Sequence, residues 1–106
     1  MEHTDELPRE PILVLETGSA MGKFFSIRKD VRIGRHPSNE ITLSDLAVSR
    51  RHAQIEVKGA DIYILDLGSV NGTFVNGAQV KDRRRIVNGD KIRVGQTDLA
   101  FRTGTQ

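Results

Sequence analysis

Short apolar runs alternate with polar and glycine-rich segments along most of the chain. The clearest run is Ala53–Lys58, in which Ala53, Ile55 and Val57 alternate with polar side chains. In an extended chain successive side chains point to opposite faces, so this alternation places the three apolar residues on one face. The pattern predicts a half-buried antiparallel strand.

Comparable runs rich in Val, Ile, Leu and Phe recur from Pro11 onward, separated by glycine and asparagine, and no window sustains a long helical period. This spacing is typical of an all-β protein, and we predict an antiparallel β-sandwich of about ten to eleven short strands. The expected strands are Ile12–Glu16, Lys23–Ile27, Val31–Ile33, Ile41–Leu43, Ala53–Lys58, Asp61–Asp66, Thr73–Val75, Ala78–Val80, Lys91–Val94 and Leu99–Arg102.

Turn chemistry agrees with this interpretation at three places. Lys58–Asp61 contains a Gly-Ala pair between two strand-like runs and is expected to close a hairpin. Val75–Ala78 contains Asn76-Gly77, the pair that type I′ turns prefer because both central residues need positive φ. Val87–Asp90 contains a second Asn-Gly pair and predicts a third hairpin.

A chain of 106 residues is long enough to fold as one domain without disulfides or a metal ion. Residues 1–10 carry four acidic side chains and one proline without apolar periodicity, so we predict a flexible acidic tail there. The domain is expected over residues 11–103, and residues 104–106 form a short C-terminal tail. We expect a monomer.

The cysteine count and the apolar runs bear on location. The chain has no cysteine, which excludes a disulfide framework and a thiolate nucleophile and fits a reducing cytoplasm. The acidic segment Met1–Glu6 lacks the positive and apolar regions of a secretory signal. Apolar stretches such as Pro11–Leu15 are far shorter than the roughly 20 residues that span a bilayer. A cytoplasmic protein without a membrane helix is therefore expected.

Three polar clusters fall between the expected strands. They are Gly34-Arg35, then Ser49-Arg50-Arg51-His52, then Ser69-Val70-Asn71-Gly72-Thr73 with Asn76-Gly77 shortly after it. Their residue types suit anion capture. Arg35 offers a planar fork of donors matched to a phosphate, Ser49 offers a hydroxyl and a backbone amide, and Arg50 adds a second positive charge.

The order and spacing of these clusters, together with the flanking strands, resemble the forkhead-associated (FHA) domain from about Ile12 to Phe101. Each cluster alone is weak evidence, whereas all three in sequence are specific. The resemblance implies an FHA/SMAD-like sandwich with the three loops together at one end. It further implies a non-catalytic module that binds a phosphothreonine-containing protein or peptide, such as a Ser/Thr kinase or its substrate, and thereby recruits phosphorylated partners in kinase signalling.

Within this resemblance, Arg35 and Ser49 contact the phosphate, and Arg50 is a further phosphate or peptide contact. Asn71 forms hydrogen bonds with the peptide main chain. Many family members carry Ser or Thr immediately before the asparagine, but this chain has Val70. The isopropyl group cannot donate, so one hydrogen bond worth on the order of 1 kcal/mol is missing, which bears on affinity rather than on the binding mode.

Other residues are expected to support the site. Gly34 is small enough to permit a backbone bend that frees Arg35 from the strand. By resemblance, His52 is structural and braces the phosphate loop through internal hydrogen bonds. The remaining supporting residues, whose roles follow from turn geometry, are Gly72, Thr73, Asn76 and Gly77.

An enzyme was the first alternative, because Ser49, His52 and Asp66 resemble the members of a catalytic triad. The segment Gly68–Gly72 superficially suggests a nucleophile elbow, but Val70 stands where the elbow needs serine and strands surround it. We therefore expect no catalysis.

Two patterns that resemble cofactor sites lack the residues such sites need. Gly18–Phe24 resembles a phosphate loop, but it has one residue too few between its glycines and lacks Ser or Thr after the lysine. His3, His36 and His52 are scattered without the spacing of metal ligands. Neither a metal ion nor another cofactor is expected.

The second alternative is binding of nucleic acid or an acidic protein through the basic segment Lys81–Arg85. The formal net charge of +2 fits an acidic ligand without requiring one. Tyr63, Phe24 and Phe74 lie in strand-like runs where burial explains them, so no platform for base stacking is evident. A solvated loop is the favoured interpretation of the segment.

Overall fold

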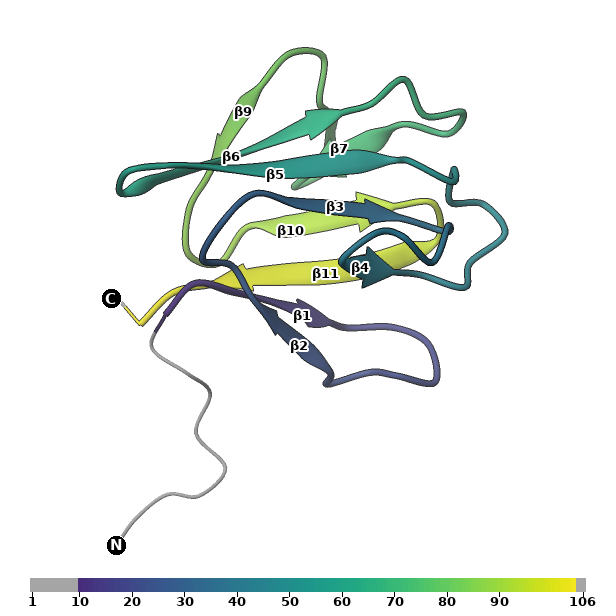
Figure 1. The fold of residues 1–106 in the computed structure, drawn as a ribbon, viewed down its shortest axis with the longest axis horizontal. Helices are drawn as coiled ribbons and strands as arrows, with labels where there is room; N and C mark the ends of the chain where they lie inside the picture. The colour runs from purple at the N-terminus through teal and green to yellow at the C-terminus, as the bar shows by residue number, and fades with distance from the viewer. Residues whose placement is uncertain (1–9, 105–106) are drawn as a thin grey trace, which may run out of the picture.

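The fold is a two-layer β-sandwich, as the sequence predicts (Figure 1). The computed structural model describes residues 10–104, and within them it has eleven strands in two sheets and no helix. None of these residues therefore belongs to a helix that could cross a membrane. The expected N-terminal tail lies outside the described residues except for Glu10, and residues 105 and 106 of the expected C-terminal tail also lie outside them.

The first sheet has six strands in the order β2-β1-β11-β10-β7-β8. Its strands are β1 (Ile12–Leu15), β2 (Phe24–Ser26), β7 (Thr73–Val75), β8 (Ala78–Gln79), β10 (Lys91–Val94) and β11 (Thr97–Arg102). Every pairing in this sheet is antiparallel. The N-terminal strand β1 is tied to the C-terminal strand β11, so the two ends of the domain stabilise each other.

The second sheet has five strands in the order β4-β3-β5-β6-β9. Its strands are β3 (Val31–Gly34), β4 (Ile41–Thr42), β5 (Ala53–Lys58), β6 (Asp61–Asp66) and β9 (Arg84–Ile86). The expected antiparallel order holds except between β3 and β4, which pair in parallel through Ile33 with Ile41 and Gly34 with Thr42. The segment between them turns back beside β3 before it pairs, so both strands run in the same direction.

Inward-facing side chains from both sheets form one core. Leu13, Leu99 and Ile92 come from the first sheet, and Ile55 and Ile64 come from the second; all five are 0% exposed. Removal of such apolar surface from water is the main favourable contribution to folding. The alternating pattern of the sequence thus places the core correctly.

Every strand predicted from the sequence is present, and most boundaries agree within two residues. One strand was missed. Arg84–Ile86 forms β9 and pairs with β6, although the sequence interpretation made Lys81–Arg85 a solvated loop. Ile86 is only 3% exposed, and its burial beneath the sheet outweighs the weak strand preference of a run of arginines.

Two of the three predicted hairpins are correct. Gly59 has φ of 62° in the β5–β6 hairpin, and Asn76 and Gly77 have φ of 51° and 86°, as a type I′ turn requires. The third prediction is wrong as a hairpin, because the turn Val87–Asp90 connects β9 to β10, which lie in different sheets. The Asn-Gly pair marks the turn there without specifying which strands pair.

The loops that carry the three polar clusters lie at one end of the sandwich (Figure 1). The β3–β4, β4–β5 and β6–β7 loops gather on the right in this view, together with the β1–β2 loop and the β10–β11 turn. The described ends of the chain lie on the left. Residues distant in sequence are thereby brought together on a rigid scaffold.

The Asn76 turn generates a prediction about stability. Asn76 has positive φ, its Nδ2 donates to Asp90 Oδ1 at 3.0 Å, and its Oδ1 accepts from the Lys91 amide at 2.9 Å. Asn76→Ala therefore loses both hydrogen bonds and strains the backbone, and we expect it to lower the free energy of unfolding by about 2–4 kcal/mol.

The matched variant Asn76→Gly tolerates the backbone angle and loses only the side-chain hydrogen bonds. It is expected to lower the free energy of unfolding by about 1–2 kcal/mol, measured by urea unfolding. Equal losses in the two variants would show that the positive φ contributes nothing.

Candidate functional site

The Arg35 backbone amide and Nε are hydrogen-bonded, and its two terminal guanidinium nitrogens are not, within residues 10–104. It follows β3, its amide donates to the Ser49 carbonyl at 3.0 Å, and its Nε donates to the Val48 carbonyl at 3.0 Å. These bonds fix the side chain against the β4–β5 loop. Because Nε is occupied by a neutral acceptor, the two terminal nitrogens keep their charge and their donors available. No carboxylate of residues 10–104 forms an ion pair with Arg35.

Gly34 permits close contact between backbones. A Cβ at this position would overlap the Arg50 carbonyl and lie 2.7 Å from Asn39 Nδ2. Gly34 is itself part of β3, so the expectation that it provides a bend away from the strand is wrong. It is needed because the β4–β5 loop passes directly over it.

Asn39 joins the first two loops of the site. Its side chain is 5% exposed, and Nδ2 donates to the carbonyls of His36 and Arg50, both at 2.7 Å. One amide group thus holds the β3–β4 loop, which carries Arg35, against the loop that carries Ser49. The sequence analysis did not identify this residue.

His52 joins the β4–β5 loop to the β6–β7 loop. The imidazole is 0% exposed; Nδ1 accepts from the Ser49 amide at 3.0 Å, and Nε2 lies 2.8 Å from the Gly72 carbonyl. Since Nδ1 accepts, Nε2 carries the proton and donates it to the carbonyl. Both ring nitrogens are therefore occupied by backbone groups, and neither is available as a general base or metal ligand.

Ser49 and Asn71 are cross-linked to neighbouring backbone but keep polar groups free. Ser49 Oγ accepts from the Val70 amide at 3.0 Å, which leaves the hydroxyl proton available to a ligand. Asn71 Nδ2 donates one proton to the Ala47 carbonyl at 2.8 Å. Its second N–H and its Oδ1 remain available to a ligand, and the side chain is exposed. The site is pre-organised before a ligand arrives.

Asp66 holds the β6–β7 loop in place. Its Oδ1 accepts from the Ser69 and Thr73 hydroxyls at 2.6 and 2.7 Å, and its Oδ2 accepts from the Gly68 and Ser69 amides at 3.0 Å. Burial alone raises the pKa of Asp66, but the hydrogen bonds from Ser69 and Thr73 outweigh it, and the pKa lies below its usual value. Asp66 is a loop anchor rather than a member of a triad.

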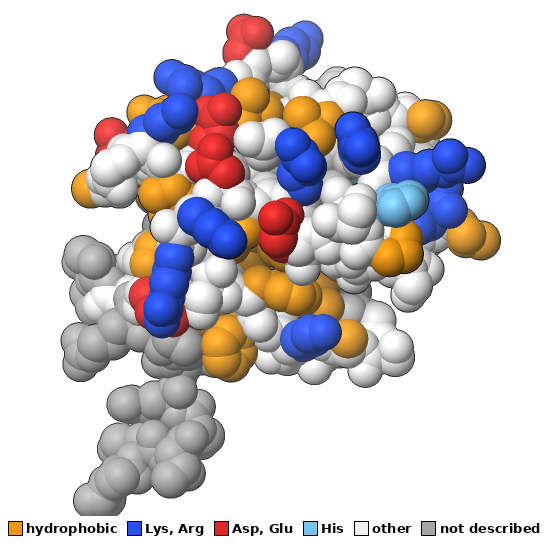
Figure 2. Space-filling model, in the orientation of Figure 1, with side chains coloured by type: hydrophobic (Ala, Val, Ile, Leu, Met, Phe, Trp, Pro, Cys, Tyr) orange, Lys and Arg blue, Asp and Glu red, His pale blue; other side chains and the backbone are white. Residues whose placement is uncertain are grey.

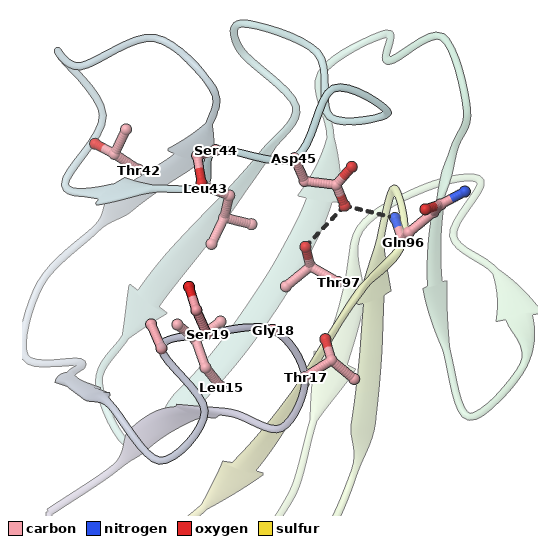
Figure 3. A pocket seen from close by; sticks show the side chains of 11 residues that line it. Leu15, Thr17, Gly18, Ser19, Thr42, Leu43, Ser44, Asp45, Gln96 and Thr97 are labelled. Atoms are coloured by element: carbon pink, nitrogen blue, oxygen red, sulfur yellow. Dashed lines mark hydrogen bonds between the residues drawn. The ribbon is translucent and has the colours of Figure 1, made fainter.

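Asp45 plays the same part in the β4–β5 loop. It accepts from the Ala47 amide, the Gln96 amide and the Thr97 hydroxyl, each at 2.8 Å (Figure 3). The carboxylate thereby ties this loop to the β10–β11 turn. Burial raises the pKa of Asp45, but hydrogen bonds led by that from Ala47 lower it below its usual value.

A surface pocket of about 320 Å³ lies beside this anchor (Figure 3). Leu15 and Leu43 line it together with hydroxyl-bearing side chains from the β1–β2 loop and β4. Asp45 is its charged wall, and the bonds to Gln96 and Thr97 occupy the oxygen that faces them. The pocket therefore borders the site, and its charged wall is a carboxylate already held by neutral donors.

The remaining supporting residues divide into two groups. Gly72 has φ of 85°, and its carbonyl contacts His52. Thr73 is 0% exposed, and its hydroxyl donates to Asp66, so both residues lie within the site. Asn76 and Gly77 do not, because they follow the far end of β7, where Asn76 bonds to the turn before β10. Their proximity in sequence to Asn71 reflects only the shortness of β7.

Positive charge gathers at the end of the molecule that carries these loops. Arg35, Arg50 and Arg51 are exposed, and none forms an ion pair within residues 10–104. Figure 2 shows an exposed histidine beside Lys and Arg side chains on the right, with no acidic side chain among them. The arrangement can attract and bind an anion. The described residues hold no group of three metal-ligating side chains.

Comparison with known proteins gives the family. The family model for the FHA domain matches residues 31–95, which include all three clusters. The chain belongs to the FHA-domain family. Its relatives include the glycogen accumulation regulator GarA of Mycolicibacterium smegmatis, 39% identical over 88% of this chain and 59% of the relative. The oxoglutarate dehydrogenase inhibitor of Corynebacterium jeikeium is 38% identical over 90% of this chain and 66% of the relative.

Solved structures agree with this assignment. An FHA domain studied for its phosphothreonine-dependent interactions superposes with a TM-score of 0.81 at 36% identity, covering 88% of this chain and 95% of that chain. The FhaA FHA domain in complex with the intracellular domain of Rv3910 gives the same TM-score and identity over 88% and 100% of the two chains. This FHA domain spans less than two thirds of the length of the first of its curated relatives.

Local signals for the two acidic anchors were present in the sequence. Asp45 lies two residues before Ala47, and Asp66 ends an expected strand two residues before Gly68-Ser69. Aspartate at such positions commonly accepts hydrogen bonds from the backbone two residues ahead. Asn39 offers no such signal, because its partners come from two different loops.

The Asp66 anchor predicts how stability depends on pH. The pKa of Asp66 is lower in the folded state than the usual 3.8, so the carboxylate stabilises the fold above that pH. The stabilisation is lost as pH falls through the lowered value. We expect the free energy of unfolding to fall below pH ~4 less steeply in Asp66→Asn than in the wild type.

At neutral pH Asp66→Asn replaces one acceptor oxygen of the carboxylate by an NH₂ donor. We expect the variant to be less stable than the wild type by about 1–3 kcal/mol in urea unfolding. Asp82→Asn is the matched control, since Asp82 is exposed and makes no hydrogen bond with residues 10–104. If the Asp66 variant and the wild type show parallel pH profiles, the carboxylate is not the anchor.

Proposed function

We propose that this FHA domain binds phosphothreonine peptides through Arg35, Ser49, Arg50 and Asn71 and recruits phosphorylated proteins without catalysing a reaction. The observation that carries the proposal is the free guanidinium fork of Arg35 beside the free hydroxyl proton of Ser49. A dianionic phosphate accepts from both groups at once. Arg50 adds unpaired positive charge, and Asn71 is placed to bind the adjacent peptide main chain.

The named activities of related proteins support this ligand. FHA domains similar to this one engage in phosphothreonine-dependent interactions. Mycobacterium tuberculosis EmbR, 31% identical with a TM-score of 0.80 over 91% of this chain and 25% of that chain, has been solved with a phosphopeptide. We infer that the partner here is a Ser/Thr kinase or a kinase substrate in the cytoplasm, bound by one FHA monomer.

The geometry of the histidine supports a non-catalytic role. A serine nucleophile requires a base at its hydroxyl, but Ser49 Oγ bonds to the Val70 amide, and the His52 ring bonds to the Ser49 amide instead of the hydroxyl. The imidazole has no nitrogen left to accept a proton from the hydroxyl. The names of the relatives, a regulator and an inhibitor, agree with this inference.

Part of the positive charge of the basic segment is already paired. Arg83 forms an ion pair with Glu56 at 3.5 Å and lies over the Tyr63 ring at 4.4 Å, while Arg85 forms an ion pair with Asp61 at 3.2 Å. Each of these two arginines has a carboxylate partner, unlike those at the loop end. The segment therefore offers nucleic acid less unpaired charge than its sequence suggests.

The central test removes the Arg35 fork. Charge-assisted hydrogen bonds contribute roughly 1.5–3 kcal/mol each, so Arg35→Ala is expected to weaken phosphopeptide binding by well over tenfold. Isothermal titration calorimetry measures the dissociation constant, and urea unfolding checks that the variant is folded. An unchanged dissociation constant in a folded variant would refute the phosphate site.

The control for this test is Arg85→Ala, which removes the same side chain from the basic segment. It is expected to leave phosphopeptide affinity unchanged, because β9 belongs to the opposite edge of its sheet from β3 and β4. Loss of binding in this variant alone would favour the alternative site.

A second prediction concerns the phosphorylated residue. Family resemblance implies a small pocket for the threonine γ-methyl group, and one methyl in a fitted apolar pocket contributes about 1–3 kcal/mol. Peptides that differ only in phosphothreonine or phosphoserine should therefore differ in affinity by tenfold or more. Calorimetry with the pair checks this, and equal affinities would contradict a shaped pocket.

A further inference from the structure

An apolar groove opens at the edge of the sandwich where β2 and β4 lie. These are edge strands of the two sheets, and residues of both strands line the groove, which has a volume of about 510 Å³. Its apolar floor consists of Phe25, Val31 and Ile41, which belong to the core or pack against it. Within residues 10–104, the three polar clusters contribute no residue to its lining. The groove is therefore a surface separate from the binding loops.

The occupant we infer for this groove is part of the same chain. We propose that the segment before β1 lies in the groove, with the Leu7 side chain on the apolar floor and the carboxylates of Asp5 and Glu6 beside the surrounding lysines. Residues 1–9 lie outside the described part of the chain. The inference goes beyond the proposed function and is independent of it, because this contact requires no phosphate.

The described part of the chain begins at the rim of the groove. Glu10 accepts from the Ser26 hydroxyl at 2.8 Å and from Arg28 Nη2 at 2.6 Å, and both donors belong to residues that line the groove. The hydrogen bond from Ser26, followed by that from Arg28, holds the pKa of Glu10 below its usual value, so the carboxylate is ionised at neutral pH. The residues before Glu10 therefore start their path beside the groove.

The sequence before Glu10 places one aliphatic side chain within reach of the floor. Leu7 is the only leucine, isoleucine or valine among residues 1–9, and it lies three positions before Glu10. An extended segment of three residues spans about 10 Å. Pro8 restricts Leu7 to extended backbone angles and has no N–H that docking would remove from water. Burial of the Leu7 side chain on the apolar floor is favourable.

The lysines near the groove complement the charge of this segment. Lys29 lines the groove, and Lys23 Nζ lies 5.3 Å from the centre of the Phe25 ring on the floor. Neither lysine forms an ion pair within residues 10–104. Figure 2 shows exposed hydrophobic side chains near the centre of the view, with Lys and Arg side chains around them. Asp5 and Glu6 directly precede the leucine, so docking brings two carboxylates to these unpaired cations.

The acidic residue that lines the groove is already engaged by the fold. Glu40 Oε1 accepts from the Arg32 amide at 2.8 Å. Since β4 pairs only with Ile33 and Gly34, this carboxylate takes the place of a strand partner for the preceding residue of β3. The hydrogen bond from the Arg32 amide holds the pKa of Glu40 below its usual value. The carboxylate is thus bound to the β3 backbone, whereas the lysines remain available to the acidic segment.

The test places one spin label on the full chain. The sequence has no cysteine, so Thr4→Cys gives a single attachment site for a nitroxide, three residues before Leu7. In ¹H–¹⁵N NMR spectra, amide signals broaden where the label comes close. At the entry to β1, Ile12 pairs with Ser26 of β2 on one side and with Arg102 of β11 on the other. The two flanks of β1 therefore serve as matched references for a segment without a preferred position.

We expect the label to broaden the amide signals of Lys29 and Ile41 more than those of Arg102 and Ala100. Leu7→Ser in the labelled chain is expected to abolish this difference, because the apolar contact is lost. This residue precedes the first strand, so the substitution leaves the core of the domain intact.

Charge reversal supplies the second variant and its control. Lys29→Glu is expected to reduce the difference between the two flanks, since the acidic segment then meets a like charge. Lys81→Glu makes the same change at an exposed position in the loop between β8 and β9, and it is expected to keep the full difference.

Four outcomes would overturn the inference. The first is equal broadening on both flanks of β1 in the labelled chain that carries no other substitution, and the second is a difference that Leu7→Ser leaves unchanged. The third is strongest broadening in the loop that carries Arg35, which would assign the segment to the binding loops. The fourth is broadening of the groove signals in unlabelled ¹⁵N chain mixed with spin-labelled chain, which would assign the groove to the segment of a second copy.

Discussion

The buried bridge through His52 is the interaction on which the binding end of this FHA domain depends. One imidazole accepts from the Ser49 amide and donates to the Gly72 carbonyl, so it fixes two loops whose sequence positions are far apart. A buried ring of this kind must satisfy both nitrogens, because an unpaired polar group away from water costs about 1–3 kcal/mol. The hydrogen-bond partners of the ring are backbone groups of the two loops, so pairing both nitrogens fixes the positions of both loops.

Three further side chains hold the loops of the binding end. Asn39 attaches the β3–β4 loop to the Arg50 carbonyl, Asp45 attaches the β4–β5 loop to the β10–β11 turn, and Asp66 closes the β6–β7 loop on itself. Loops of this length are ordinarily the mobile part of a sandwich. Here hydrogen bonds within the fold order the loops, so the proposed ligand does not bear the entropic cost of placing Arg35 and Ser49.

The sequence predicted the scaffold well because local patterns determine it. Alternation identified the strands and Asn76-Gly77 identified a type I′ turn, since both depend on residues that are neighbours in the chain. Prediction from the sequence failed where pairing between distant segments decides the structure. Arg84–Ile86 is a strand because β6 lies beside it, and the Asn88-Gly89 turn joins two sheets instead of two paired strands.

The same distinction holds for the site. The order of the clusters identified Arg35, Ser49 and Asn71 as candidates. The importance of Gly34 was predicted for the wrong reason, because its requirement comes from a carbonyl of another loop. Asn39 was missed for the same reason, since its partners are not near it in sequence. Local spacing reveals which side chains are available, whereas the contacts that aim them are set by the tertiary structure.

Each residue proposed for ligand binding divides its polar groups between the fold and the ligand. Arg35 bonds to the scaffold through one guanidinium nitrogen and leaves the other two unpaired. Ser49 accepts one hydrogen bond and leaves its hydroxyl proton unpaired, and Asn71 donates one N–H and leaves the rest of its amide unpaired. Leu46 and Val70 contribute only backbone groups to the fold and expose their side chains. Changes in Arg35, Ser49 or Asn71 therefore remove an anchoring bond along with a proposed ligand contact. Changes in the two exposed apolar side chains remove none and cost little stability. The proposed recognition thus uses side-chain groups that the fold itself leaves unpaired.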